Sequence, residues 1–264
     1  MVIFIALFNS HLKESIKKLS ISSKNTSYSQ FSFTQIESLP SPVQRYFRYS
    51  LNQGQHYISD ARLIHDGEFR QNEHQKWMPI RGEEYFSTEQ PGFVWLGKIQ
   101  LLPFIWITGL DELIDGQGKF QIKLMSHITI AEAPKGRKLD EGELMRWLGE
   151  TPLFPTALLP SKYLKWEDVD SNSSKAVVNY DELAVNLIFY FNESGEIIKM
   201  EGNRYRSIND SYVKEKWVGY YSNYTKIENM MVPLALEVAW NTQAGIFSYA
   251  KFNIKEIFYN FQKY

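Results

Sequence analysis

The second half of the chain alternates apolar and polar residues with a period of two, and this pattern constrains the fold more than any other feature of the sequence. In one segment, every second position is apolar, at Leu183, Val185, Leu187, Phe189 and Phe191. Successive side chains of a strand point to opposite faces of a sheet. The spacing therefore predicts a half-buried strand with these five residues on its buried face.

Comparable segments follow at short intervals, and turn-like residues separate them. They read EIIKMEGNRYRSI, SYVKEKWVGYYSNY, MMVPLALEVAW and IFSYAKFNIKEIFY, with NESGE, IND, IEN and TQAG as the separating turns. Short turns join antiparallel neighbours, whereas parallel strands need long crossovers. The region therefore predicts an antiparallel meander, and the chain from Tyr57 onward alternates in the same way.

Two segments have helical spacing instead. In LPSPVQRYFRYSLNQG, the sequence predicts a helix with Ser41 as N-cap and Gln44 closing a capping box. In KLDEGELMRWLGETPLFP, the expected N-cap is Asp140 and the closing residue is Glu143. Together these elements predict an α+β fold, in which one large curved antiparallel β-sheet carries short helices that cover its concave side.

The N-terminal region has a different character. Met1–Phe8 is apolar but too short to span a bilayer, and it lacks the basic region and cleavage site of a signal peptide. Apolar residues at helical spacing follow at Leu12, Ile16 and Leu19. Met1–Leu19 is expected either to make a peripheral membrane contact, to pack on the body as a terminal helix, or to be the remainder of a longer segment. Residues 1–38 are predicted to be an anchor-like helical segment with a polar linker, and residues 39–264 a single β-rich domain.

Composition narrows the classes of partner and cofactor. With 29 basic and 30 acidic residues the formal charge is -1, so there is no overall positive field to attract nucleic acid. The absence of cysteine excludes disulfides, thiolate metal sites, cysteine nucleophiles and lipid attachment to cysteine. Of the five histidines, only His65 and His74 are expected to face each other across a hairpin, and packed or surface imidazoles are favoured over a metal site. No metal and no cofactor is predicted.

Candidate site residues gather around the apolar stretch GKIQLLPFIWITG. Pro103 cannot donate a hydrogen bond within a sheet, so this segment is expected at an edge or lip. The candidates for the wall of an apolar cavity are Trp95, Phe104, Trp106 and Trp147. The polar candidates are Glu143 and Arg146, expected to pair as a structural brace, and Asp111, expected to lie with Glu112 and Asp115 in a solvated turn. The alternative is that the same aromatic residues fill a closed core.

Several blocks of the sequence resemble an uncharacterised bacterial family, one of the domain-of-unknown-function families. They are LPSPVQRYFRYSL, QPGFVWLGKI and EGELMRWLGETPLFPTALLP, and the resemblance covers most of Leu39–Ile254. The resemblance implies no activity. Members of the family often begin with membrane-spanning segments, which implies a membrane-associated or extracytoplasmic location, with a cytoplasmic one as the alternative. More distantly, the predicted fold is similar to the half-open barrels of the lipoprotein carriers LolA and LolB, which implies a cavity suited to acyl chains.

The leading hypothesis is therefore a protein that binds a lipid or another apolar small molecule in a half-barrel cavity. One alternative is an enzyme that acts on an apolar substrate with Glu143, Arg146 and Asp111 as its polar residues. Another is a protein-interaction or membrane-docking module. A cavity without polar groups favours a carrier, whereas convergent carboxyl groups with shifted pKa values favour an enzyme. Whether there is catalysis, and in which oligomeric state, is left open by the sequence.

Overall fold

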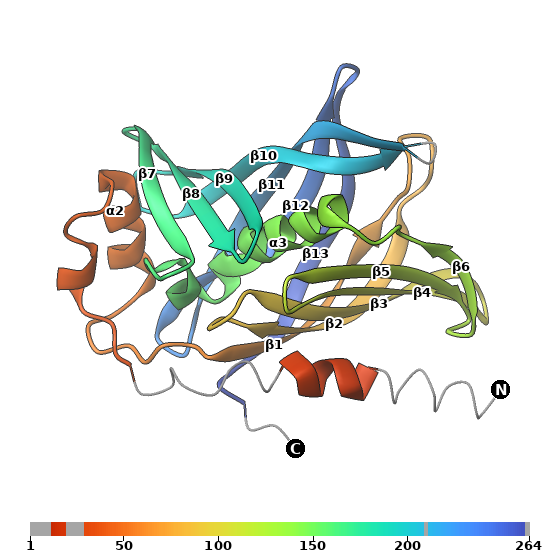
Figure 1. Cartoon of the computed structure of the whole chain (residues 1–264), viewed down its shortest axis with the longest axis horizontal. Coiled ribbons are helices and arrows are strands. Elements are labelled where there is room, and N and C mark those ends of the chain that lie inside the picture. The colour runs from red at the N-terminus through yellow and green to blue at the C-terminus, as the bar shows by residue number, and fades with distance from the viewer. Residues whose placement is uncertain (1–11, 20–28, 209–210, 262–264) are drawn as a thin grey trace.

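The computed structural model describes residues 12–19, 29–208 and 211–261. Within them, thirteen strands form one antiparallel sheet in the order β6-β5-β4-β3-β2-β1-β13-β12-β11-β10-β9-β8-β7 (Figure 1). The strands are β1 Asp60–Phe69, β2 Met78–Ser87, β3 Gly92–Leu102, β4 Ile105–Ile114, β5 Gln117–Leu124, β6 Ile128–Glu132, β7 Leu164–Asp170, β8 Ser173–Tyr180, β9 Leu183–Phe191, β10 Ile197–Ile208, β11 Ser211–Ile227, β12 Met230–Thr242 and β13 Gly245–Tyr259.

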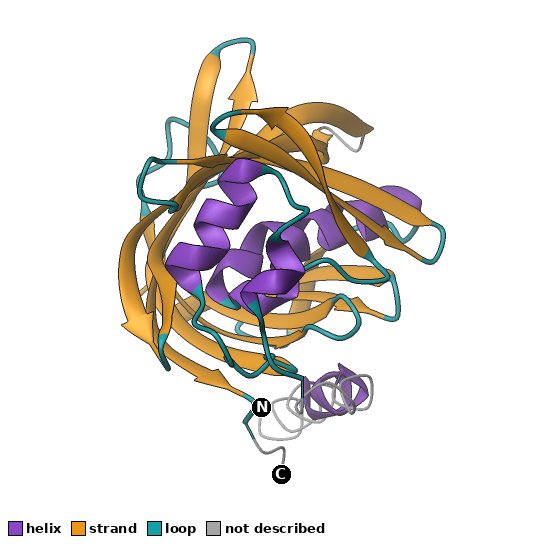
Figure 2. Ribbon diagram, turned by 90° about the vertical axis from the view of Figure 1, so that its left-hand side faces the viewer, coloured by secondary structure: helices purple, strands orange, loops and turns teal. Residues whose placement is uncertain are grey.

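The chain builds this sheet from two meanders. It runs outward from β1 to β6, crosses through a helical segment to β7, and returns strand by strand until β13 pairs with β1 in antiparallel register, Ala61 opposite Tyr259. The sheet curls into an open half-barrel whose concave side holds the helices (Figure 2). The predicted fold class is confirmed.

The helices on the concave side are α2 Ser41–Ser50 and α3 Arg137–Glu150, with the 3₁₀ turns η1 Phe33–Ile36, η2 Thr151–Leu153 and η3 Pro155–Leu158. Helices α2 and α3 are stabilised because their apolar faces pack against the sheet. Val43 and Phe47 of α2 are fully buried, as are Leu144 and Leu148 of α3. These residues belong to one hydrophobic core that extends over most of the sheet.

Both helix starts differ from the prediction. Ser41 lies inside α2, the N-cap is Pro40, and the Gln44 amide donates to the backbone carbonyl of Leu39 at 2.8 Å instead of closing a capping box. Helix α3 begins three residues before Asp140, and the Asp140 carboxylate accepts a hydrogen bond from the Gly118 backbone at 2.7 Å. In both cases a tertiary or preceding-loop contact uses the side chain that the local pattern had assigned to a cap.

The strand that most constrained the prediction is β9, and its predicted face is confirmed. Its five alternating apolar residues are all 8% exposed or less, and Leu187 and Phe189 are fully buried. The Phe189 ring packs against Trp166 of β7, with ring centroids 5.6 Å apart. One face of β9 therefore belongs to the core, as a period of two requires.

Residues 12–19 form a helix on the outer, convex face of the sheet (Figures 1 and 2). Leu19 is 4% exposed and joins a small cluster with Val94 of β3 and Leu110 of β4. Ser15 donates to the Glu112 carboxylate at 2.9 Å. This part of the predicted Met1–Leu19 segment thus packs on the body, while residues 1–11 lie outside the described residues. None of the described helices is both long and apolar enough to cross a membrane.

Candidate functional site

The concave side of the sheet contains a cavity of about 320 Å³ between α3 and strands β1–β5 and β10–β13. Most of its wall is aromatic or aliphatic. Its phenylalanine and tryptophan residues are Phe69, Trp95, Phe120, Trp217, Trp240 and Phe252. Charged side chains from α3, β4 and β10 complete the lining, so the cavity is apolar along most of its wall and polar over a limited part of it.

The elements present these side chains for simple geometric reasons. Leu139, Glu143, Arg146 and Glu150 of α3 line the cavity at spacings of four, three and four residues, which place them on one face of the helix. Strand β4 lines it with every second residue, from Ile107 through Gly109 to Asp111. The cavity therefore lies between one helix face and the concave face of the sheet.

Trp95 is held across this wall by contacts that require small neighbours. A Cβ atom on Gly97 would lie 2.2 Å from its indole ring, and one on Gly109 would lie 2.9 Å from it. The indole N–H donates to Nε2 of His65 at 2.9 Å, and the two rings are parallel within 2°. Burial lowers the pKa of His65 to about 4, with the nearby Arg146 acting in the same direction, so His65 accepts this hydrogen bond as a neutral imidazole.

The polar part of the cavity is organised around Arg146. Its guanidinium donates to Glu84 of β2 at 2.8 Å, to Asp111 of β4 and to Glu150 one helical turn away at 3.3 Å. It also lies 5.1 Å from the centroid of the Trp95 ring. Only 13% of the Arg146 side chain is exposed, so these are buried ion pairs, which stabilise strongly only when every charge has a partner.

A second pair lies beside the first. Arg204 of β10 is 3.4 Å from the Glu143 carboxyl, donates to the Gly142 backbone carbonyl at 3.0 Å, and stacks 4.8 Å from the Trp217 ring. The predicted brace between Glu143 and Arg146 is therefore wrong in its partners. The two residues share the cavity-facing side of α3, but each pairs with a charge brought in from a strand.

Four carboxyl groups and two guanidinium groups make up this buried cluster. Burial, together with the neighbouring Glu150, raises the pKa of Glu84 well above its usual value, and burial with the neighbouring Asp111 does the same for Glu143. Burial by itself would lower the pKa of Arg146, but the surrounding carboxylates overcome it and raise that pKa. With Glu84 and Glu143 protonated, the cluster carries no net charge.

The hydrogen bonds agree with two bound protons. Among the described residues, Asp111 Oδ1 and Glu150 Oε2 are buried without a donor from any N–H or hydroxyl group. Glu143 lies against Asp111 and Glu84 against Glu150, and each contact raises the pKa of the first carboxyl. A proton on Glu143 and another on Glu84 would thus complete both contacts, because a protonated carboxyl is a donor.

Not all the candidates from the sequence reach the cavity. Trp95, Asp111, Glu143 and Arg146 line it, whereas three aromatic candidates do not. Phe104 is 87% exposed in the β3–β4 turn, and Trp147 is buried with its indole N–H donating to the Ser87 carbonyl at 3.0 Å. Trp106 alternates with the cavity residues of β4 and so points to the convex face, where Lys98 lies 4.0 Å from its ring centroid.

Other expectations for this region are also corrected. Asp111 and Glu112 do not lie in a solvated turn, because both are on β4 and each is only 5% exposed. Of the two places expected for the stretch around Pro103, the sheet edge is wrong, since β3 and β4 are paired on both sides; Pro103 lies in the exposed turn between them, which leaves the lip as the remaining expectation. His65 and His74 do not face each other, because Phe69 and Met78 close the hairpin pairing and His74 lies in the loop beyond it. Among the described residues, no group of three or more histidine, aspartate or glutamate side chains is placed to hold a metal ion.

Sequence reasoning missed Glu84, Glu150 and Arg204. Glu84 lies on the concave face of β2 while Glu83 points away and pairs with Arg62. A charged residue on a strand face that is otherwise buried was the available signal for Glu84, since such residues are rarely buried without a partner. For Glu150 the signal was its spacing of four residues from Arg146.

The exposed apolar side chains also have a distinct location. Of the twelve described large hydrophobic residues that are at least 37% exposed, seven lie in or next to the turns of the β3–β4 and β5–β6 hairpins, namely Leu101, Leu102, Phe104, Ile105, Met125, Ile128 and Ile130. These hairpins are neighbours in the sheet. Ile99 and Ile107, close to the same β3–β4 turn, belong to the cavity wall.

Comparison with known proteins gives a family but no activity. A family model described as a family of unknown function, DUF6920, matches residues 37–259. No curated protein matches the chain. The match to the family model bears out the resemblance of the sequence blocks to an uncharacterised family.

Three solved structures are similar to this one at low identity. A putative outer membrane lipoprotein-sorting protein domain from Vibrio parahaemolyticus is 8% identical, with a TM-score of 0.41 over 83% of this chain and 91% of that one. A LolA superfamily protein from Nitrosomonas europaea is 10% identical, with a TM-score of 0.43 over 82% and 91% of the two chains. A DUF1329 family protein from Desulfovibrio piger is also 10% identical, with a TM-score of 0.43 over 84% and 94%. The fold assignment therefore rests on the strand topology, and no function follows from these scores.

Proposed function

The chain belongs to the DUF6920 family, whose function is unknown, and we propose that its concave cavity binds a lipid or another apolar small molecule. The supporting observation is the lining. A volume of about 320 Å³ with a mostly aromatic and aliphatic wall is typical of a small-molecule pocket that also carries a few oriented polar groups.

The polar groups bear on how such a molecule would lie. Arg146 and Glu143 face the cavity but are already paired with strand residues. A neutral hydrogen-bonding group of the ligand can reach this cluster without adding a charge, whereas an additional buried charge would need its own partner. The inner end of the ligand is therefore expected to be apolar or to carry a hydroxyl or carbonyl group.

The test is ligand retention and probe uptake by the full chain. Native mass spectrometry and solvent extraction of the purified protein should reveal a bound apolar molecule, and a fluorescent fatty-acid probe should bind. Ala133→Trp adds an indole at the cavity wall and should abolish uptake, while Ala244→Trp, an exposed change in the β12–β13 turn, should not. A wild-type protein with no extractable molecule and no probe uptake would disprove the proposal.

A second candidate function is catalysis on the same molecule, and the carboxyl pair Glu143 and Asp111 favours it. An acid that keeps its proton at neutral pH beside a second carboxyl group is an arrangement used for general acid–base chemistry. Glu143→Gln keeps the shape of the side chain but removes its proton. If the protein is a carrier, the variant should retain the same extracted molecule as wild type. If it is an enzyme, the variant should accumulate a molecule of different mass.

A further inference from the structure

Strands β9 and β10 are only partly paired, and the gap between them is a feature that the proposed function does not use. Their pairing covers Ile188–Phe191 of β9 and Ile197–Glu201 of β10. The pairing ends there, although the strands are still close at Gly202, where a Cβ atom would lie 2.7 Å from the Leu187 side chain. Among the described pairings, the rest of β9 bonds only to β8 and the rest of β10 only to β11.

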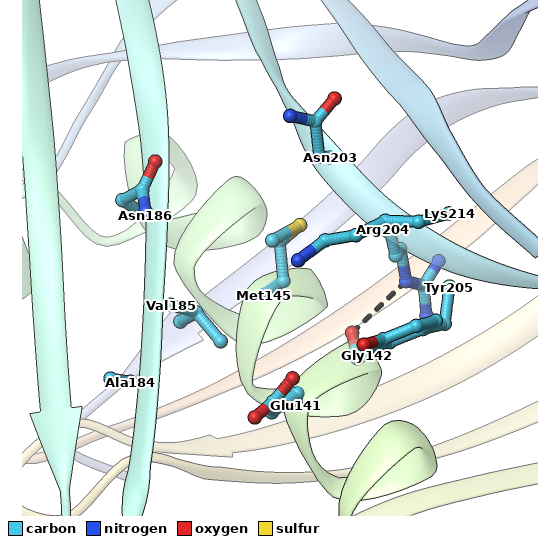
Figure 3. Close-up of a pocket in the computed structure, with 10 residues that line it drawn as sticks. All are labelled: Glu141, Gly142, Met145, Ala184, Val185, Asn186, Asn203, Arg204, Tyr205 and Lys214. Carbon is cyan, nitrogen blue, oxygen red and sulfur yellow. Dashed lines mark hydrogen bonds between the residues drawn. The ribbon is translucent and has the colours of Figure 1, made fainter.

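The gap contains a pocket of about 120 Å³, here called the slot, which is shown in Figure 3. Helix α3 lies behind it, and β9 and β10 form its sides. Its polar lining consists of Glu141, Asn186, Asn203, Arg204, Tyr205 and Lys214. Asn186 and Asn203 are exposed, so their amides can meet a ligand from solvent. Among the described residues, the facing edges of β9 and β10 beyond their pairing also present backbone hydrogen-bonding groups to this gap.

The charges of the slot favour an anion. Lys214 and Arg204 contribute two positive charges, and the acidic Glu141 is paired with Arg137 at 2.8 Å. The nearest carboxyl to Arg204 is Glu143, whose pKa burial and Asp111 raise well above its usual value. Arg204 is already counted within the neutral buried cluster, so the surplus positive charge of the slot is that of the exposed Lys214.

The slot and the cavity adjoin each other, because Arg204 and Tyr205 line both. We propose that the slot binds the phosphate head group of an amphiphile whose apolar part occupies the cavity. This inference rests on the proposed function and names its ligand class. A phosphate monoester presents several oxygen acceptors, which suit a lysine, an arginine and two asparagine amides together.

The experiment compares three probes on the full chain by calorimetry. They are dodecyl phosphate, dodecanol and inorganic phosphate. Lys214→Glu reverses a slot charge, and Lys226→Glu makes the same exposed change elsewhere on β11 as the matched control. Asn203→Asp replaces a slot amide by a carboxylate, with Asn179→Asp, exposed on β8, as its control.

Wild type should bind dodecyl phosphate about tenfold or more tightly than dodecanol, as one charged contact is typically worth. Lys214→Glu and Asn203→Asp should remove this preference and leave dodecanol binding unchanged, while both controls behave as wild type. Equal binding of both alkyl probes, or a preference that survives both slot variants, would overturn the inference and leave the proposed function standing. Failure of both alkyl probes to bind would refute both. Binding of inorganic phosphate alone, lost in Lys214→Glu, would show that the anion is free phosphate and refute the amphiphile.

Discussion

Replacement of Arg146 by methionine tests the buried charge cluster most directly. Arg146 lies between three carboxyl groups and is only 13% exposed, so Arg146→Met leaves Glu84, Asp111 and Glu150 without their common partner. A stranded carboxylate in such a site takes up a proton instead of staying charged. The fold should therefore survive with a loss of stability that depends on pH.

The size of the loss follows from the cost of that proton. Glu84 is already protonated, so the additional proton goes to another carboxyl; for Glu150, whose ordinary pKa is 4.5, protonation on folding at pH 7 costs about 3.4 kcal/mol, from 2.5 pKa units at about 1.36 kcal/mol each. At pH 5 the same step costs about 0.7 kcal/mol. The estimate at pH 7 agrees with the loss of about 3–5 kcal/mol that breaking a buried ion pair typically causes.

Urea unfolding at pH 7 and pH 5 measures both values. Arg48→Met is the matched control, because Arg48 is exposed on α2 and its guanidinium lies over the Phe33 ring at 5.2 Å. That contact is worth about 0.5–1 kcal/mol at an exposed site and should change little with pH. Equal losses in the two variants, or a loss in Arg146→Met that is the same at both pH values, would refute the account of the cluster.

The other expectations concern exposure and a buried imidazole. Phe104→Asp should change the free energy of unfolding by less than about 0.5 kcal/mol, because Phe104 is 87% exposed, whereas Phe189→Ala should cost about 3–5 kcal/mol at a fully buried position. Denaturant melts check both, and similar losses would contradict the assignment of faces. His65 has a pKa of about 4 in the fold against 6.5 for the free side chain, so below pH 6.5 the unfolded state binds more protons. Its contribution to stability should therefore rise by about 3 kcal/mol from pH 4 to pH 6.5. His65→Gln should flatten this part of the stability profile, and an unchanged profile would exclude His65 as its source.

The sequence by itself determined the elements whose signal is local. A period of two along β9 specified both the strand and its buried face, because adjacent side chains of a strand point in opposite directions whatever the rest of the chain does. The short turns between the later strands likewise required antiparallel neighbours. Helical spacing around Leu144 and Leu148 marked α3 for the same kind of reason.

Only the tertiary structure decided where polar side chains found their partners. Asp140 bonds to the backbone of Gly118 instead of capping its helix, and Arg146 pairs with Glu84, 62 residues away. The closing of β13 on β1 also joins distant parts of the chain, and the pairing between β9 and β10 ends short of the full strands. The local sequence around a charged side chain does not identify its partner. The strength of an ion pair depends on burial and on the distance between the two charges, and both are set only when the sheet has curled around α3.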